Sequence, residues 1–301
     1  MYLLPVPVLG LLALTLLPAP ARSTAPEAPL QVVVSILPQQ FLVERIAGGR
    51  VKVLVLVRPG DNEATYTPGP ATLAALDGAR AWFTIGVPFE DTWQGRIARD
   101  RPALEIVPLA DGLPQRAMDD IAGEARGHGH EGRPDPHTWT DPRLAARMVA
   151  TIAATLARLD PAGASIYQTS ARALQYELQA LHEEITARLE PVRGRTFIVF
   201  HPSWGYFADA YGLVQLPIEL GGREPGPRSL AELVNRSRAA GARAVFVQPQ
   251  FSQRSATAVA QALGVELIEA DPLAPDYVAN LRSIAASMAT ALADPPPAAR
   301  P

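Results

Sequence analysis

The feature that most constrains the fold of this 301-residue chain is a long amphipathic helix predicted between two α/β halves. Its apolar side chains recur alternately every four and three positions within residues 161–190, which places them on one face of a helix. These side chains are Tyr167, Ala171, Leu174, Leu178, Leu181 and Ile185. A helix of this length spans about 40 Å. Its length and position favour a strut connecting two lobes over an ordinary helix inside one domain.

Short runs rich in β-branched residues precede this helix, and a second series follows it. Helical patterns separate the runs in both halves, which predicts βαβ units and mainly parallel sheets. The first half has strand-like runs at 31–36, 51–57, 81–85 and, more weakly, 104–108, with helices at 40–47 and 70–77; the second has runs at 196–200, 244–247 and 265–268, with helices at 229–240, 255–263 and 276–292. The predicted fold class is α/β, with two similar lobes bridged by a single long α-helix.

The N-terminus has the pattern of a secretory signal peptide. It is uncharged and Leu-rich, and it ends in the A-x-A site Ala19-Pro20-Ala21. The alternative is a buried N-terminal helix, because no Lys or Arg precedes the apolar stretch. Cleavage after this site indicates export to the periplasm. The expected organisation is a signal peptide at 1–21, a first lobe at 22–160, the connecting helix at 161–191, and a second lobe with a Pro/Ala-rich tail at 192–301.

Composition excludes several classes of protein and limits the chemistry of any metal site. The net charge of −3 lacks the basic excess of a nucleic-acid-binding protein. The chain has no cysteine, which excludes disulfides, thiolate metal ligands, cysteine nucleophiles and a cysteine-linked lipid anchor. Neither H-E-x-x-H nor G-x-S-x-G occurs, so we expect no enzyme. A periplasmic zinc hydrolase stays a minor alternative, with Glu63 or Glu224 as its base.

Three segments place metal-binding side chains at the ends of predicted elements. His137 lies between prolines in the stretch 135–142, where Asp141-Pro142 has the pattern of a helix N-terminus. His201 and Asp271 each follow a predicted strand, and open parallel sheets bind ligands beyond the carboxyl ends of their strands. Imidazole and carboxylate donors together suit Zn²⁺, Mn²⁺ or Fe²⁺.

The other histidines are weaker candidates. His128 and His130 lie in a predicted flexible loop at 113–134, as either an accessory metal-collecting tract or incidental solvated residues. His182 lies on the flank of the long helix, which favours a structural or solvated role.

The chain resembles the zinc- and manganese-binding solute-binding proteins of ABC importers known as cluster A-I, over essentially its whole mature length. Residues 135–142 match the family pattern D-P-H-x-W-x-D-P, and residues 200–212 match F-H-P-x-[WF]-G-Y-F…Y-G-L. Asp271-Pro272-Leu273 matches the C-terminal acidic ligand. The resemblance implies two α/β lobes bridged by one long helix, with His137, His201 and Asp271 as metal ligands.

The chain departs from the family pattern at the first ligand. The family carries a histidine four residues after the glycine of the first binding loop, and counting from Gly60 gives Ala64. Glu63, immediately before, is the candidate replacement, since some zinc-type members have Glu there; the alternative is a solvated loop carboxylate. Otherwise a water or a group on a bound chelator completes the four donors of a tetrahedral site.

The function implied by the resemblance is capture of a divalent metal ion between the lobes and delivery to a membrane permease with its ATPase subunit. Zinc is favoured and Mn²⁺ or Fe²⁺ are alternatives, because added carboxylates make the donor set harder. Binding of a metal–chelate complex is a further alternative. We expect a periplasmic monomer whose metal affinity falls below about pH 6.5, as protons compete for the histidines.

Overall fold

The computed structural model describes residues 29–118, 134–219 and 223–294, and it contains two parallel sheets. The first lobe has the strand order β2-β1-β3-β4, and the second repeats it as β6-β5-β7-β8. The strands are β1 (Leu30–Val34), β2 (Val51–Val55), β3 (Ala81–Thr84), β4 (Glu105–Pro108), β5 (Thr196–Val199), β6 (Val214–Pro217), β7 (Ala244–Val247) and β8 (Glu266–Glu269). The predicted α/β class with two similar lobes is confirmed.

Helices connect the strands, and proline begins several of them. Pro70, Pro88, Pro142 and Pro227 each occupy the first turn of a helix, where the missing N–H has no partner to lose. The helices are α1 (Leu37–Ala47), α2 (Pro70–Ala75), α3 (Pro88–Asp100), α4 (Pro142–Leu159), α5 (Ala164–Leu189), α6 (Gly205–Tyr211), α7 (Pro227–Ala239), α8 (Arg254–Leu263) and α9 (Tyr277–Leu292).

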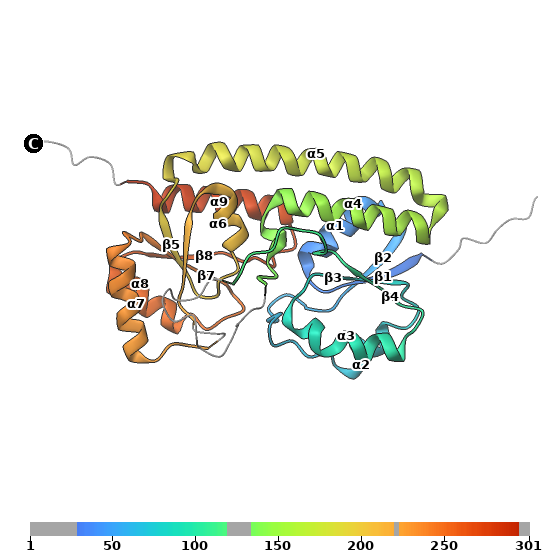
Figure 1. The fold of residues 1–301 in the computed structure, drawn as a ribbon, viewed down its shortest axis with the longest axis horizontal. Helices are drawn as coiled ribbons and strands as arrows, with labels where there is room; N and C mark the ends of the chain where they lie inside the picture. Colours follow the sequence, from blue (N-terminus) through green and yellow to red (C-terminus); the bar gives the residue numbers. More distant parts are fainter. Residues whose placement is uncertain (1–28, 119–133, 220–222, 295–301) are drawn as a thin grey trace, which may run out of the picture.

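The predicted connecting helix is α5, which runs across both lobes (Figure 1). Every residue of the predicted apolar stripe is buried, and Leu189 extends the stripe by one more turn. α4 and α1 of the first lobe and α9 of the second pack against this helix. Short 3₁₀ turns, Pro161–Gly163 and Glu190–Val192, flank it. The strut is therefore held from both lobes.

Several elements of the structure were not predicted. β6 has only four residues and ends in Pro217, a composition that is compatible with the edge position it occupies and gives little strand signal. α3 buries only Phe89, Glu90 and Ile97, too few for a continuous apolar stripe.

The apolar core joins the lobes. One cluster of buried side chains extends from the first lobe through α5 to α9 and one face of the second sheet. The other face of that sheet packs in a smaller cluster with α7 and α8. Side chains along β5 alternate between the two: Phe197 and Val199 belong to the large cluster, and Ile198 to the small one. The lobes therefore share buried surface and are not independent bodies on a flexible linker.

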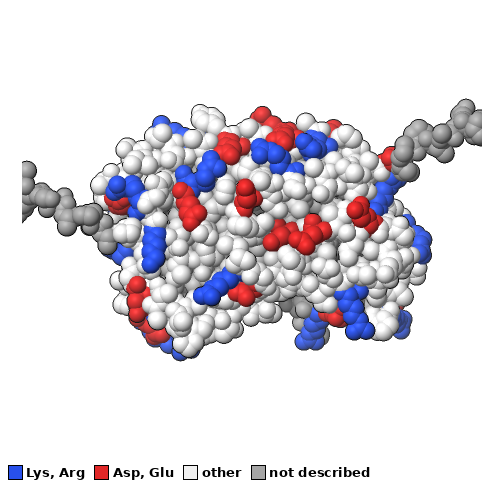
Figure 2. All heavy atoms as spheres, turned by 180° about the vertical axis from the view of Figure 1, so that it is seen from behind, with Lys and Arg blue, Asp and Glu red and all other residues white. Residues whose placement is uncertain are grey.

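The surface opposite the view of Figure 1 carries interspersed charges (Figure 2). Lys and Arg residues and Asp and Glu residues are both spread over this face. Across the described ranges, no helix is both long and apolar enough to cross a membrane.

Candidate metal centre

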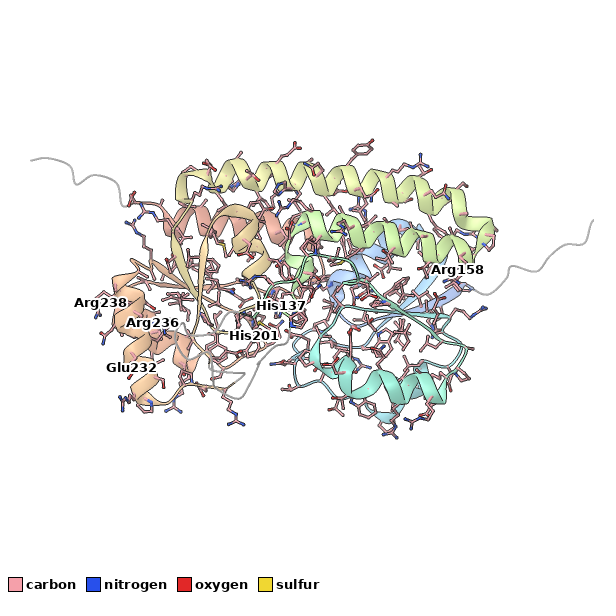
Figure 3. All side chains as sticks on the ribbon, in the orientation of Figure 1. His137, Arg158, His201, Glu232, Arg236 and Arg238 are labelled. Carbon is pink, nitrogen blue, oxygen red and sulfur yellow. The ribbon has the colours of Figure 1, made fainter. Side chains whose placement is uncertain are left out.

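The structure brings three of the four predicted site residues together between the lobes. Glu63 comes from the loop that follows β2, His137 from the turn before α4, and His201 from the end of β5. The two histidines face each other at the junction of the lobes (Figure 3). Their exposed fractions are 2% for Glu63, 1% for His137 and 4% for His201. One candidate ligand atom from each lies within 4.8 Å of the other two.

The turn that carries His137 is fixed by its own sequence. As predicted, Asp141 caps α4 by accepting a hydrogen bond from the amide of Arg143, and Pro142 occupies the first helical position. Between them and His137 lies a 3₁₀ turn, Thr138–Thr140, closed by the Thr140 hydroxyl donating to the His137 carbonyl. This places the imidazole just ahead of a rigid helix start.

The spacing of the donor atoms matches a tetrahedral ion. The Nε2 atoms of His137 and His201 lie 3.3 Å apart. Two nitrogens bound to tetrahedral zinc at about 2.0–2.1 Å are separated by about 3.3–3.4 Å. Oε1 of Glu63 lies 3.6 Å from Nε2 of His137, close to a second edge of the same tetrahedron. Two of the three pairs of donor atoms thus lie at about the separation that such an ion requires, and all three atoms lie within 4.8 Å of one another.

Buried carboxylates hold both imidazoles from behind. Nδ1 of His137 lies 2.7 Å from Oδ1 of Asp135, and Nδ1 of His201 lies 2.7 Å from Oε1 of Glu219. In a neutral imidazole, an Nδ1–H donated to a carboxylate leaves the lone pair on Nε2, the atom nearest the opposite imidazole, as in carboxylate–histidine–metal arrangements. Sequence reasoning missed both carboxylates. Asp135 was visible as part of the 135–142 motif, but Glu219 follows β6, which gave no strand signal.

Neighbouring charges shift the pKa values of His137 and Glu63. Burial alone would lower the pKa of His137, but the charges of Asp135 and Glu63 and their hydrogen bonds outweigh it and raise the pKa to about 9. Burial raises the pKa of Glu63, yet the hydrogen bond from His137 and the charges of both histidines outweigh burial and bring this pKa below its usual value. Glu63 is therefore an anionic carboxylate beside a protonated imidazole. A metal ion bound at Nε2 of His137 would have to displace that proton.

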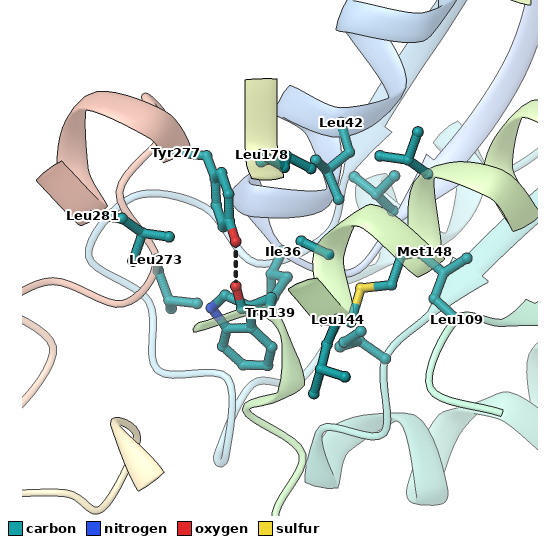
Figure 4. Packing of buried hydrophobic residues seen from close by; sticks show 14 of the residues in the cluster. Ile36, Leu42, Leu109, Trp139, Leu144, Met148, Leu178, Leu273, Tyr277 and Leu281 are labelled. Atoms are coloured by element: carbon teal, nitrogen blue, oxygen red, sulfur yellow. Dashed lines mark hydrogen bonds between the residues drawn. The ribbon is translucent and has the colours of Figure 1, made fainter. Parts of the chain in front are cut away.

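Asp271 does not belong to this group of three. Its Oδ1 accepts hydrogen bonds from Nε2 of Gln250 at 2.7 Å and from the amide of Leu273 at 2.9 Å. The segment that carries it nevertheless contacts the turn of His137, because Nε1 of Trp139 donates to the carbonyl of Pro272. The Tyr277 hydroxyl, at the start of α9, donates to the carbonyl of Trp139 (Figure 4). The two lobes are thus hydrogen-bonded beside the candidate site.

The loop at the family's first ligand position directs Glu63 inward. Oδ1 of Asn62 accepts a hydrogen bond from the amide of Ala64, an Asx turn that bends the chain at this point. Ala64 itself carries no donor atom. His128 and His130 lie outside the described residues. His182 is half-buried against Tyr211, with its Nδ1 3.3 Å from that hydroxyl.

Comparison with known proteins assigns the chain to a family. Residues 32–291 match the family model described as ZnuA, zinc-uptake complex component A, periplasmic. This chain belongs to the ZnuA family. A crystal structure of ZnuA covers 88% of this chain and 100% of its own, with a TM-score of 0.81 and 37% sequence identity.

Curated relatives of the ZnuA family include proteins named for two metals. The high-affinity zinc uptake system protein ZnuA of Brucella abortus is 28% identical over 299 residues, covering 83% of this chain and 89% of its own length. The manganese-binding lipoprotein MntA of Halalkalibacterium halodurans is 29% identical over 245 residues, covering 79% and 77%. Both names describe metal uptake or binding and not catalysis.

Proposed function

We propose that this protein is the substrate-binding component of an ABC importer, capturing a divalent transition metal ion between its lobes and delivering it to a permease and its ATPase subunit. The observation that carries this proposal is the pair of buried imidazoles with their Nε2 atoms 3.3 Å apart, each backed at Nδ1 by a buried carboxylate. Membership of the ZnuA family supports the transport role.

Glu63, His137 and His201 are the proposed ligands, with Asp271 as the fourth. Glu63 takes the role of the histidine absent at position 64, and its burial and its proximity to His137 support this over a solvated loop carboxylate. Asp271 lies on the segment bonded to Trp139 but outside the group of three. A water or a chelator's donor atom is the alternative fourth ligand, which keeps a metal–chelate cargo as the second candidate.

Zinc is the proposed cargo. Two imidazoles suit it, and four-coordinate sites are its usual arrangement in proteins. The carboxylates of Glu63 and Asp271 make Mn²⁺ or Fe²⁺ the alternatives. One of the relatives above is named for zinc and the other for manganese, which supports zinc as a cargo and manganese as its alternative.

We infer that the protein works as a monomer in the periplasm after cleavage of residues 1–21, a segment that lies outside the described residues. The manganese-binding relative is named a lipoprotein. This cysteine-free chain has no thiol for such a lipid.

The test is the metal content of the protein purified from the periplasm, measured by mass spectrometry together with the Glu63→Ala variant. We expect one zinc per chain and reduced zinc in the variant. Glu266→Ala, which removes an exposed carboxylate at the start of β8, is the matched control and should keep its zinc. Manganese or iron would change the cargo and keep the function. No metal after reconstitution would refute the proposal.

An enzyme would be revealed by turnover. Three protein ligands with an open position also form catalytic zinc sites, where bound water becomes the nucleophile. We propose that this chain is not such an enzyme. Zinc-dependent hydrolysis of an ester or phosphate substrate would contradict this part of the proposal.

A further inference from the structure

One arginine joins carboxylates of both lobes beside the candidate metal site. Nη1 of Arg116, in the first lobe, lies 2.7 Å from Oδ2 of Asp135. Its Nε lies 2.9 Å from Oδ2 of Asp209, on α6 of the second lobe. The side chain of Arg116 is only 17% exposed, and that of Asp135 is fully buried. A single guanidinium therefore holds one carboxylate from each side of the junction.

The neighbouring residues of α6 pack closely against this guanidinium. Its central carbon lies 5.8 Å from the ring centre of Tyr206, whose hydroxyl accepts a hydrogen bond from the amide of Arg116. The same hydroxyl lies 3.2 Å from the carbonyl of Asp135, to which it donates. A Cβ at Gly205 would lie 1.7 Å from Nη1 of Arg116, so any larger residue there would displace the guanidinium. The contact is consequently part of the lobe junction and not a chance surface ion pair.

Both imidazoles are connected to Arg116 through short links. On the first lobe, Oδ1 of Asp135 bonds Nδ1 of His137 while Oδ2 bonds Arg116. On the second lobe, His201 precedes α6 by only four residues, and α6 carries Tyr206 and Asp209, which contact the arginine. Because each lobe contributes one imidazole, the distance between their Nε2 atoms depends on how the lobes are held together. Arg116 lies where it can fix that distance.

We propose that Arg116 is an interlobe positioning residue that sets the separation of the His137 and His201 imidazoles and thereby slows metal release. It touches neither the metal nor the Nε2 atoms, and it acts through Asp135 and α6. Losing an outer partner of a ligating histidine typically weakens metal binding 10- to 100-fold. The metal half of this inference rests on the proposed function, whereas the joining of the lobes does not.

The first measurement is zinc affinity and release rate, by competition with a fluorescent chelator, for wild type, Arg116→Gln and Arg116→Lys. We expect the dissociation constant of Arg116→Gln to rise about 10- to 100-fold, with faster release. Arg116→Lys should fall between, since one ammonium lacks the fork that holds two carboxylates. The matched control is Arg158→Gln, which breaks an exposed ion pair on α4 far from the site (Figure 3) and should match wild type.

The second measurement needs no metal. Because the chain has no cysteine, spin labels attach only where cysteines are introduced, here by Thr92→Cys on α3 and Asn235→Cys on α7, both exposed. We expect a narrow distribution of label distances in otherwise wild-type protein and a broader one with Arg116→Gln. If Arg116→Gln does not fold, Tyr206→Phe, which removes only the hydroxyl, should show smaller changes in the same direction in both measurements.

The two measurements separate the possible failures. If wild type binds zinc, a folded Arg116 or Tyr206 variant in which only one readout changes, or neither, overturns the proposal. If wild type binds no metal, the proposed function fails, and the label distances alone decide the role of Arg116: a broader distribution supports its joining of the lobes, and an unchanged one overturns it.

Discussion

Metal binding should release a proton from His137 at neutral pH. The sequence alone suggests competition below about pH 6.5, the usual range of histidine. In the structure, His137 is buried, and the charges of Asp135 and Glu63 more than offset this burial and raise its pKa to about 9. Since a metal needs the lone pair on Nε2, binding at pH 7 must displace the proton held there.

The size of this effect follows from the two pH values. At pH 7 the solution is about two pH units below the pKa of His137, so proton competition weakens metal binding about 100-fold, or about 3 kcal/mol, relative to the fully deprotonated imidazole. The dissociation constant for zinc should fall about tenfold per unit between pH 7.0 and 8.5. The stability that the proton on His137 gives the metal-free protein changes in the opposite direction: it is fully present below about pH 6.5 and is lost as pH rises through about 9.

Titration calorimetry in buffers of different ionisation enthalpy measures this proton directly. At pH 7 we expect about one proton released from His137 per zinc bound. His182→Gln, which removes the half-buried histidine of α5 that contacts Tyr211 and lies outside the group of three, is the control and should release the same number. A flat dissociation constant between pH 7.0 and 8.5, with no proton release, would refute the reasoning.

Three further predictions concern the support of the site and the fold. Glu219→Gln removes the carboxylate behind His201, so zinc affinity should fall about 10- to 100-fold in chelator competition. Leu178→Ala opens the core under α5 and should cost about 2–5 kcal/mol in chemical denaturation, whereas Tyr176→Ala, on the exposed face, should cost under about 0.5. Burial, partly offset by hydrogen bonds, raises the pKa of Glu90 to about 7. The stability that its proton provides is therefore lost as pH rises from 4.5 through 7. Glu90→Gln should flatten the dependence of the unfolding free energy on pH over that range, and an unchanged slope would contradict this.

Local patterns carried much of the fold. The stripe of α5 was predictable because the burial of a helix face leaves its period in the sequence, and all six predicted positions are buried. The cap at Asp141-Pro142 was predictable for the same reason, since capping needs only neighbouring residues. β6 was missed because an edge strand of four residues owes its conformation to its pairing with β5 and not to its own composition.

The candidate site likewise contains residues that the sequence predicted and contacts that it did not. The proline-flanked motif predicted His137, its place after a strand predicted His201, and the family resemblance suggested Glu63; the structure places these three together. Position after a strand also predicted Asp271, whose carboxylate bonds Gln250 and the amide of Leu273 in the structure and which stays a proposed ligand. No spacing rule indicated Glu219 behind His201 or the bridge from Arg116 to Asp209. Each of these contacts joins separate elements, over 18 residues for Glu219 and 93 residues for Arg116.

By itself, the sequence determined the architecture of two lobes and a connecting helix. It also determined the available metal donors, which are imidazoles and carboxylates without thiolates. Only the tertiary structure decided which donors converge, because the 3.3 Å between the two Nε2 atoms depends on how one lobe is held against the other. The raised pKa of His137 likewise needs Asp135 and Glu63 to be buried beside it. Protonation and donor spacing are thus properties of the packed lobe junction, since burial and charge proximity arise only when distant segments meet.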